Sequence, residues 1–462
     1  MIVSDALRQD VLGCYGGDAR TPNLDWLAKN GVLFENAYST SPWTAPSAVS
    51  MFTGNYATTY GCSPHAKTRR TGPIRIYVPR SEHLFVEALN QDGYVTAMKI
   101  ENVNASMHNN LQGFESIPDS VSFDHVVDKI KSITGGDAYD SPAYKVYGGT
   151  ELMETPAYQS SFGVMSHLLE LDPEDNFFLL HWMLDPHYPY DPVEKFNSQI
   201  VVDESELPQD KKVYSRAMHT MADLSKAEQR YVRDLYIKEV ESVDERVGFV
   251  VKTLKHKGLL DNTYIVFTSD HGEHFGEHGL FGHGGHGLGC HYYEDLLKVP
   301  LIIFGPELPK GKRFKDNVSN LDLMPTLKDL LRVEYEDDMQ GHSYKALMFG
   351  DASRGGVLYF DDVRTHEQND ALLDGNFKLI SLKDSNFELY NLTEDGGESV
   401  NIASSQPDRV ASMYDAVLRL RKTNSDRQEK NIAALDEDDL RELSDQEKQD
   451  IIKKLKSLGY IR

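Results

Sequence analysis

The sequence places acidic and histidine side chains directly after apolar runs that predict buried strands. Asp5 ends the run MIVSD, Asp270 ends NTYIVFTSD (262–270), and His271 follows at once. In open α/β sheets ligands bind beyond the carboxyl ends of the strands, so these three side chains are expected to meet there. Two carboxylates and an imidazole suit a divalent metal ion, although a single acid after a strand is commonly a turn former or a helix cap.

A hydroxyl lies at the start of a predicted helix in the stretch SPWTAPSAVSMFTG (41–54). Pro46 is expected to mark the start of this helix and Gly54 its end, which places Thr44 at or just before the helix N-terminus. The unpaired N–H groups and the dipole of a helix N-terminus favour an anion, including an ionised alkoxide. Thr44 is therefore a candidate fourth ligand of the metal, with a plain N-cap as the alternative.

The stretch SDHGEHFGEHGLFGHGGHGLGCH (269–291) contains six histidines among many glycines. Glycine lets the backbone approach a ligand closely, and a neutral histidine can bind a metal, carry a proton or hold an oxyanion. Upstream, the loop DPHYPYDP (185–192) follows another predicted strand and brings His187 to the same expected sheet edge. Some of these histidines must be solvated or structural. For His187 the alternative to a functional role is a loop histidine whose hydrogen bonds are satisfied locally.

Acidic residues outnumber basic ones, with 72 Asp and Glu against 48 Lys and Arg and a formal net charge of −24. Such a charge disfavours general affinity for nucleic acid or anionic membranes. The segment HAKTRRTGPIR (65–75) departs from this balance because it carries four basic residues and no acid. We expect this segment, including Lys67 and Arg69, either to draw in an anionic substrate or to be a solvated loop.

No stretch approaches the roughly 20 apolar residues of a membrane-spanning helix. The first residues, MIVSD, run straight into a predicted strand and do not resemble a signal peptide. The three cysteines, Cys14, Cys62 and Cys290, are odd in number and widely separated, which argues against a disulfide framework. Together these features predict a cytoplasmic protein in a reducing compartment, although a removed leader would leave no trace.

Strand-like runs alternate with amphipathic helices along most of the chain, which is typical of an α/β sheet covered on both faces. Continuous apolar runs predict central strands at 176–184 and 262–270, and VPLIIFGP predicts a further strand at 299–306. From Val240 to Leu254, valines and a leucine recur at three- and four-residue intervals and predict a helix that crosses back over the sheet.

Two further segments predict helices, one near each end of the chain. TPNLDWLAKNG (21–31) begins with a threonine cap and a proline and ends with a glycine, which is typical of a short helix. The last segment, 436–462, is highly charged but keeps helical periodicity, and we expect a surface helix there.

The texture changes after about residue 355, where the runs GVLYF, NFKLISL and FELYNL are separated by turns. They predict a small antiparallel sheet, followed by helices from about Pro407 onward. We therefore expect a catalytic α/β domain over residues 1–355 and a smaller α+β subdomain over 356–462.

The order of these motifs resembles that of the sulfatases of the alkaline phosphatase superfamily, and the resemblance covers nearly the whole chain. It is carried by IVSDALRQDVLGCYGG, TPNLDWLAKNGVLFENAYS, the segment ending in MFTG, DPHYPYDP, NTYIVFTSDHGEHFGEHGLFGHGG, NLDLMPTLKDLL, FELYNLTEDGGESVNIA and LKSLGYI. The resemblance implies a large mixed, mostly parallel sheet flanked by helices, with a smaller antiparallel sheet towards the C-terminus.

The resemblance also implies roles for individual residues. Asp5, Asp270 and His271 match metal ligands, with Thr44 at the nucleophile position. His187 matches the histidine that contacts the substrate or the leaving group, and His283 falls where many members carry a lysine or histidine that contacts the transferred group. His65 falls near another substrate-contacting position, and we expect Lys67 and Arg69 to bind substrate beside it.

Three positions depart from the family pattern. Sulfatases carry a cysteine or serine that is oxidised to formylglycine, whereas this chain has Thr44, whose oxidation would give a ketone. Ala48 stands where an arginine is expected, and Ala6 replaces the second aspartate of the usual pair. We therefore expect no formylglycine, and a site with few carboxylates suits manganese or zinc better than calcium.

These features predict a metal-dependent hydrolase that cleaves small anionic esters, phosphate or phosphonate esters before sulfate esters, through Thr44 and a covalent intermediate. Three alternatives remain open: a soluble phosphotransferase that passes the group to an alcohol, a sulfatase that works without formylglycine, and a glycan-binding pseudoenzyme. Many family members assemble from identical chains, so a homo-oligomer is also open.

Overall fold

The computed structural model describes residues 1–62, 75–106, 108–118, 126, 128, 155–200, 224–283, 291–336, 338–350, 356–363, 369–383 and 386–435. An eight-stranded sheet forms the centre, in the order β12-β2-β11-β8-β1-β7-β5-β6. Its strands are β1 (Ile2–Ser4), β2 (Val32–Tyr38), β5 (Val95–Ile100), β6 (Glu115–Ser116), β7 (Phe177–Met183), β8 (Ile265–Ser269), β11 (Lys298–Phe304) and β12 (Lys312–Ser319).

The first strand of the chain lies at the middle of this sheet. β1 pairs in parallel with β7 on one side and with β8 on the other. β11 is antiparallel to both β8 and β2, while the remaining pairs are parallel. The predicted mixed, mostly parallel sheet is therefore confirmed, and its parallel centre brings the carboxyl ends of β1, β7 and β8 to one edge.

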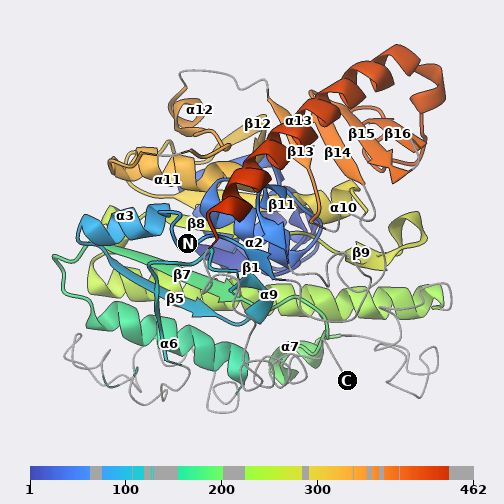
Figure 1. Cartoon of the computed structure of the whole chain (residues 1–462). Coiled ribbons are helices and arrows are strands. Elements are labelled where there is room, and N and C mark those ends of the chain that lie inside the picture. Colours follow the sequence, from blue (N-terminus) through green and yellow to red (C-terminus); the bar gives the residue numbers. More distant parts are fainter. Residues whose placement is uncertain are drawn as a thin grey trace, which may run out of the picture.

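Helices cover both faces of the sheet (Figure 1). One face packs on α1 (Pro22–Asn30), α6 (Pro156–Glu170) and α9 (Lys226–Lys257). The other face packs on α2 (Thr44–Thr53), α3 (Phe85–Gln91), α11 (Leu323–Leu331) and α12 (Lys345–Phe349). Because successive side chains of a strand point to opposite faces, Ile2 belongs to the first apolar cluster and Val3 to the second.

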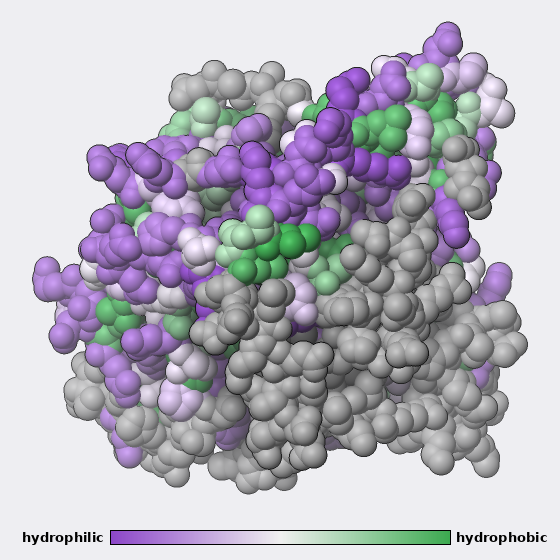
Figure 2. All heavy atoms as spheres, viewed as in Figure 1, coloured by the Kyte–Doolittle hydropathy of each residue, from purple (hydrophilic) through white to green (hydrophobic). Residues whose placement is uncertain are grey.

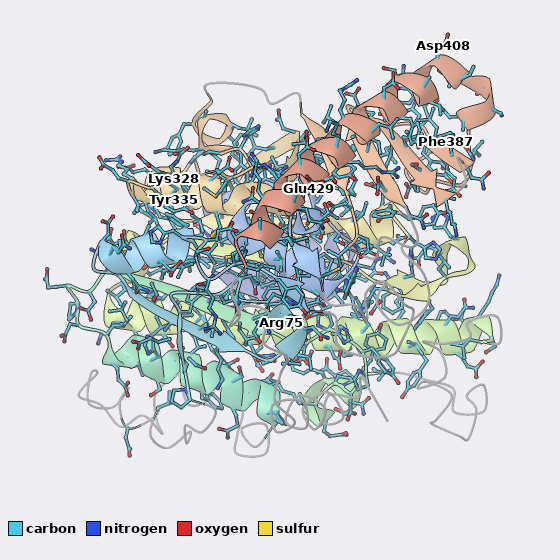
Figure 3. All side chains as sticks on the ribbon, in the orientation of Figure 1. Arg75, Lys328, Tyr335, Phe387, Asp408 and Glu429 are labelled. Atoms are coloured by element: carbon cyan, nitrogen blue, oxygen red, sulfur yellow. The ribbon has the colours of Figure 1, made fainter. Side chains whose placement is uncertain are left out.

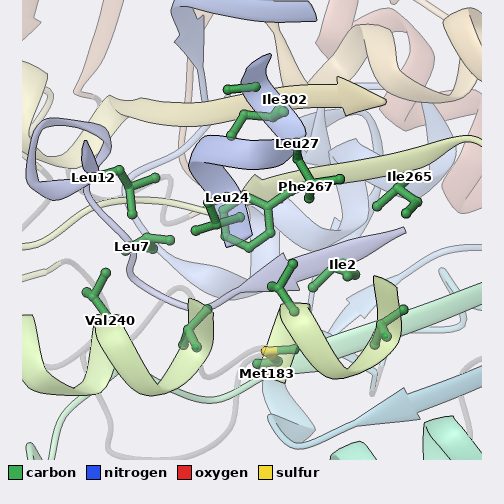
Figure 4. Close-up of a cluster of buried hydrophobic side chains, with 14 of the residues drawn as sticks. Ile2, Leu7, Leu12, Leu24, Leu27, Met183, Val240, Ile265, Phe267 and Ile302 are labelled. Atoms are coloured by element: carbon green, nitrogen blue, oxygen red, sulfur yellow. The ribbon is translucent and has the colours of Figure 1, made fainter. Parts of the chain in front are cut away.

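Figure 4 shows the first of these clusters, in which helix residues close over the middle strands. Leu24 and Leu27 of α1 lie near Phe267 of β8 and Ile302 of β11. Val240 of α9 belongs to the same cluster and lies away from the two leucines. The predicted crossover helix is confirmed in α9, which begins with a capping box at Ser225 and ends at Gly258. The helix predicted at 21–31 is confirmed in α1, which Gly31 ends.

The helix that carries the predicted nucleophile starts earlier than expected. α2 begins at Thr44 itself and Trp43 is its N-cap, so the expected start at Pro46 was two residues late and the N-cap interpretation of Thr44 is wrong. A proline fits anywhere in the first turn, because none of the N–H groups there has an intrahelical acceptor. Gly54 ends the helix with a left-handed φ of 67°, as predicted.

A separate antiparallel sheet follows towards the C-terminus, in the order β13-β14-β15-β16. Its strands are β13 (Val357–Phe360), β14 (Asp370–Asp374), β15 (Phe377–Leu382) and β16 (Asn386–Asn391), of which β14 was not among the expected runs. The long helix α13 (Pro407–Ala433) packs on this sheet through Val410, Met413 and Val417.

The other end of α13 reaches the large sheet's side of the molecule. Figure 3 labels Asp408 near the start of the helix and Glu429 near its end, and the helix runs diagonally between the two parts. Gln428 Nε2 donates to the carbonyl oxygens of Thr58 and Tyr60, at 3.0 and 2.8 Å. The domain boundary at residue 355 stays a prediction, and the helix expected over 436–462 lies outside the described residues.

The remaining elements are short. They are β3 (Gly61–Cys62), β4 (Ile76–Tyr77), β9 (His274–Phe275), β10 (Phe281–Gly282), α7 (Glu194–Asn197) and α10 (Glu294–Leu297). Hydrophilic side chains dominate the coloured part of the face shown in Figure 2. Among the helices that the structure describes, none combines the length and apolar character that a bilayer crossing requires.

Candidate active site

Asp5, Asp270 and His271 lie together at the carboxyl ends of β1 and β8, the two strands that pair in the middle of the sheet. All three side chains are fully buried. His271 Nε2 is 3.7 Å from Asp5 Oδ1 and 3.4 Å from Asp270 Oδ2. The predicted convergence of two carboxylates and an imidazole is therefore present.

Each carboxylate uses one oxygen to fix its orientation and leaves the other free. Asp5 Oδ2 accepts hydrogen bonds from Asn102 Nδ2 at 2.6 Å and from Trp182 Nε1 at 3.1 Å. Asp270 Oδ1 accepts from the backbone N–H groups of Ala6, at 3.1 Å, and His271, at 2.9 Å. Asp5 Oδ1 and Asp270 Oδ2 are buried without a hydrogen bond to any residue that the structure describes.

The imidazole of His271 also presents a lone pair to the same point. Its Nδ1 lies 2.8 Å from the carbonyl oxygen of Gly272, which can only accept, so Nδ1 donates and the lone pair of the neutral ring is on Nε2. A carbonyl acceptor behind a histidine is the usual way of fixing a metal-binding tautomer. Three oriented lone-pair donors without hydrogen-bond donors between them fit a divalent cation.

The electrostatics of the pair agree with this fit. Burial raises the pKa of Asp270 to about 7. Burial, and then the neighbouring Asp270 carboxylate, raises the pKa of Asp5 well above its usual range. Two buried carboxylates that repel each other are costly to ionise, and a bound cation would offset that cost.

Thr44 places its hydroxyl against this group. Its side chain is almost completely buried, and Oγ1 lies 3.3 Å from His271 Nε2. Ser47, in the same first turn of α2, donates from Oγ to the carbonyl oxygen of Asp270 at 2.7 Å. The start of α2 is thereby tied to the end of β8, which holds the Thr44 hydroxyl beside the carboxylates.

A second group of side chains, His187 and His283, lies next to His271. The ring centroids of His271 and His283 are 4.4 Å apart, and those of His187 and His283 are 4.7 Å apart. His187 Nε2 and His283 Nε2 are 3.2 Å apart. The loop after β7 and the segment after β10 therefore bring both predicted histidines to the group formed by Asp5, Asp270 and His271.

Glu273 contacts this histidine pair through His283. His283 Nδ1 lies 2.9 Å from Glu273 Oε1, and Tyr190 donates its hydroxyl to Glu273 Oε2 at 2.9 Å. Glu273 is fully buried, and burial raises its pKa to about 7. A continuous hydrogen-bonded chain therefore runs from Tyr190 through Glu273 and His283 to His187.

The acceptors beside the two rings suit a proton held along this chain. His187 Nδ1 lies 2.5 Å from the carbonyl oxygen of Tyr188, so it donates, and His283 Nδ1 faces the Glu273 carboxylate. With both Nδ1 atoms protonated, two neutral rings would point lone pairs at each other across the Nε2–Nε2 contact. One extra proton between Glu273 and His187 would resolve this conflict.

The structure thus brings together six of the residues that the sequence singles out: Asp5, Thr44, Asp270, His271, His187 and His283. His65, Lys67 and Arg69 lie outside the described residues, so the predicted substrate-binding segment stays a prediction.

Three supporting residues were missed by the sequence analysis. Asn102 follows β5 at the same sheet edge, so a polar side chain after a predicted strand was the signal for it. Glu273 lies in the histidine-rich stretch 269–291, and its position between His271 and His274 was the signal for it. Trp182 lies inside an apolar strand, and nothing in the sequence distinguishes its indole N–H from a core side chain.

Comparison with protein families decides the family. The model described as "Sulfatase" matches residues 1–333, which is well over half of the chain. The chain belongs to the sulfatase family. A second model, described as the C-terminal part of N-sulphoglucosamine sulphohydrolase, matches residues 276–423 of this sulfatase-family protein.

Curated relatives of this sulfatase-family hydrolase cover most of its length. An arylsulfatase of Clostridium perfringens is 28% identical over 390 residues, which are 75% of this chain and 77% of the relative. A choline-sulfatase of Rhizobium meliloti is 27% identical over 363 residues, covering 68% of this chain and 64% of the relative. Both relatives are named as sulfatases, which are ester hydrolases. This chain is likewise an ester hydrolase of the sulfatase family.

Solved structures confirm the sulfatase-like fold. A phosphonate monoester hydrolase of Agrobacterium radiobacter superimposes with a TM-score of 0.69 at 20% identity, covering 92% of this chain and 95% of that chain. A structure solved with its substrate D-glucosamine-2-N,6-O-disulfate superimposes with a TM-score of 0.67 at 20% identity, covering 92% and 97%.

The surroundings of Thr44 differ from the pattern that the family resemblance implies. Ala48, where the resemblance leads us to expect arginine, is fully buried in the apolar cluster between α2 and the sheet. Its methyl group packs with that cluster, so this turn of α2 directs no cation towards Thr44.

Proposed function

We propose that this protein is a metal-dependent hydrolase that transfers the phosphoryl or phosphonyl group of an ester first to Thr44 and then to water. One observation carries the proposal: the buried Thr44 hydroxyl lies 3.3 Å from His271 Nε2, beside two carboxylate oxygens that have no hydrogen bond to a described residue. A hydroxyl so placed is suited to activation as a nucleophile.

Asp5, Asp270 and His271 would hold the cation, with Thr44 as a further ligand. When bound, a divalent ion lowers the pKa of a coordinated hydroxyl and neutralises a nonbridging oxygen of the ester. One histidine among few carboxylates favours manganese or zinc, with calcium as the less suited ion.

In the first step Thr44, having released its proton to solvent, forms a bond from Oγ1 to phosphorus while the bond from phosphorus to the ester oxygen breaks. His187 supplies the proton that the departing oxygen takes up, and His283 faces the charged oxygens of the transferred group. The chain from Glu273 through His283 restores a proton to His187.

In the second step water attacks the phospho-threonine and its oxygen replaces Oγ1 on phosphorus. The proton of that water goes to Oγ1, and the chain of Glu273, His283 and His187 takes back from solvent the proton that Thr44 released in the first step, so the enzyme is regenerated. The reaction is then a two-step hydrolysis with a covalent intermediate on Thr44, and formylglycine has no part in it.

Sulfate esters are the second candidate substrates, because the curated relatives include an arylsulfatase and a choline-sulfatase. The same steps apply with sulfur in place of phosphorus. The cytoplasmic location stays a prediction from the cysteine pattern, and the homo-oligomer stays open.

Turnover of four 4-nitrophenyl esters tests the proposal: a phosphate monoester, a phosphate diester, a phosphonate and a sulfate. Metal-stripped protein is resupplied with manganese, zinc or calcium and compared with Thr44→Ala and Thr44→Ser. We expect preference for a phosphorus ester with manganese or zinc, a loss of at least about 10³-fold in kcat/KM for Thr44→Ala, and partial retention in Thr44→Ser.

Thr423→Ala provides a matched control, because Thr423 is exposed on α13. It should leave turnover unchanged. Undiminished turnover in folded Thr44→Ala would contradict the proposed nucleophile, and preference for the sulfate ester would favour the second candidate substrate.

A further inference from the structure

A second group of potential metal ligands lies beside the first but shares no residue with it. His274 comes from β9, Glu277 begins the 3-10 turn at Glu277–Gly279, and Asp295 comes from α10. One ligand atom from each lies within 4.8 Å of the corresponding atoms of the other two. His274 Nδ1 is 3.5 Å from Asp295 Oδ2, which is longer than a good hydrogen bond.

His274 is buried, and the polar contact of its ring within the part of the chain that the structure describes is the 3.5 Å approach of Nδ1 to Asp295. Only 2% of the residue is exposed, and neither Nδ1 nor Nε2 makes a hydrogen bond to a residue that the structure describes. A neutral imidazole has one donor and one acceptor nitrogen, and burying both without partners is costly. A buried imidazole turned towards two carboxylates therefore has the character of a ligand without its ion.

The charges around His274 are also unbalanced. The Arg8 guanidinium pairs with three carboxylates: Asp10 at 2.7 Å, Glu277 at 2.7 Å and Asp295 at 3.1 Å. One positive charge therefore faces three negative charges, an excess that a divalent cation would neutralise. Arg8 approaches Asp295 through Oδ1, which leaves Oδ2 on the side of His274.

Solvent reaches this group from one side. Arg8, Asp10 and Asp295 contribute to the lining of a cavity of about 370 Å³ between the large sheet's edge and the small sheet. The side chain of Glu277 is 36% exposed. A hydrated cation can therefore approach the carboxylates and exchange water for the imidazole.

We propose that His274, Glu277 and Asp295 bind a second divalent transition-metal ion, of which zinc is the best representative. A mixed set of one imidazole and two carboxylates, with water completing the coordination, is typical of zinc and related ions. The ion would also fix Glu273, whose backbone N–H donates to the Asp295 carbonyl oxygen at 3.1 Å.

Zinc stoichiometry of the full chain tests this site without reference to catalysis. In a chelator-stripped Asp5→Asn, Asp270→Asn double variant the first group is disabled, and we expect one zinc ion per chain after gel filtration. Adding His274→Gln should remove that ion. Adding His256→Gln, which changes an exposed histidine near the end of α9, should leave it bound.

Folding of each variant is followed by circular dichroism. If His274→Gln does not fold, Glu277→Gln replaces it, and X-ray absorption of zinc in the double variant should show one imidazole ligand. Native-like protein that binds no zinc, or zinc that stays bound in folded His274→Gln, would overturn the proposal. His274 would then only pair with Asp295.

Discussion

His187 Nε2 and His283 Nε2 lie 3.2 Å apart, although 96 positions separate the two residues in the chain. Both rings direct their Nδ1 atoms at acceptors, a carbonyl oxygen and a carboxylate. The contact joins two loops, and a proton shared between the two Nε2 atoms would satisfy it. In the proposed reaction this proton is the one that the leaving group takes, and the first prediction follows from it.

Replacing His187 should slow esters with poor leaving groups more than esters with good ones. An alkoxide needs a proton as it departs, whereas 4-nitrophenolate does not, and general acid catalysis is typically worth 10²–10⁴-fold. We expect His187→Asn to lose about that factor on an alkyl phosphonate ester and much less on the 4-nitrophenyl ester. Equal losses on the two substrates, measured as kcat/KM, would show that His187 does not protonate the leaving group.

Asp270→Asn should stabilise the metal-free protein while it abolishes turnover. The amide oxygen can keep the hydrogen bonds from Ala6 and His271, and its N–H group can donate to His271 Nε2, which lies 3.4 Å from the present Oδ2. The repulsion with Asp5 disappears at the same time. We expect the free energy of unfolding to rise by about 1 kcal/mol without metal.

Metal addition provides the converse of that experiment. In chains that carry His274→Gln, which removes the proposed second site, manganese or zinc should raise the melting temperature of the protein with native Asp270. It should leave that of Asp270→Asn nearly unchanged, because binding stabilises only a folded state that holds the ion. An equal rise in both proteins, measured by differential scanning calorimetry on chains that also carry His274→Gln, would contradict Asp270 as a ligand.

Arg246 should be needed for the position of His187. This buried residue of α9 pairs with Glu101 and with Asp185, the latter at 3.2 Å, and Glu101 accepts from the Leu184 N–H at 2.9 Å. Glu101 therefore holds the backbone of Leu184 and Arg246 holds the side chain of Asp185, so the two residues together fix the segment just before His187. Arg246→Leu leaves two largely buried carboxylates without their cation and should cost about 3 kcal/mol in the free energy of unfolding.

The pH dependence separates this network from simple loss of packing. Burial alone would raise the pKa of Glu101, but Arg246 lowers it from 4.5 to about 2. Ionised Glu101 therefore contributes stability that is complete above pH 4.5 and is lost as the pH falls towards 2. Urea unfolding should show wild type and Arg246→Leu converging over that window, and a constant difference would contradict the ion pair.

Asp361 should show the opposite pH dependence. It is buried near α13, where Thr58 Oγ1 donates to its Oδ2, and burial raises its pKa from 3.8 to about 8. The unfolded state ionises first, so the contribution of neutral Asp361 to stability falls as the pH rises from 3.8 to about 8. Asp361→Asn should lose less melting temperature than wild type between pH 5 and pH 9, and parallel losses would contradict this account.

The sequence predicted the centre of the fold well because its signals are strong and local. The apolar run that became β8 and the valine spacing of α9 leave little choice of element, and Gly54 and Gly31 end their helices as expected. The start of α2 was placed too late because a proline is equally acceptable at several first-turn positions. The missing strand β14, Asp370–Asp374, has only five residues and acids at both ends.

The site was predictable as a set of residues but not as a set of contacts. Strand ends indicated Asp5 and Asp270, and the family resemblance indicated His187 and His283. The direct contact between the two histidines depends on how two distant loops pack, which no local pattern encodes. Glu273 was missed for the same reason, because its role comes from its contact with the imidazole ring of His283.

The central claim is that Thr44 forms a covalent bond to the transferred group, and rapid acid quenching during turnover tests it most directly. The metal-loaded protein is mixed with a 4-nitrophenyl phosphate or phosphonate ester, quenched before the steady state, digested and analysed by mass spectrometry. The account predicts a phosphoryl or phosphonyl group on Thr44 that is absent without metal, and no such group at this position in Thr44→Ala. A burst of 4-nitrophenol with unmodified Thr44, or with the group on another residue, would contradict it.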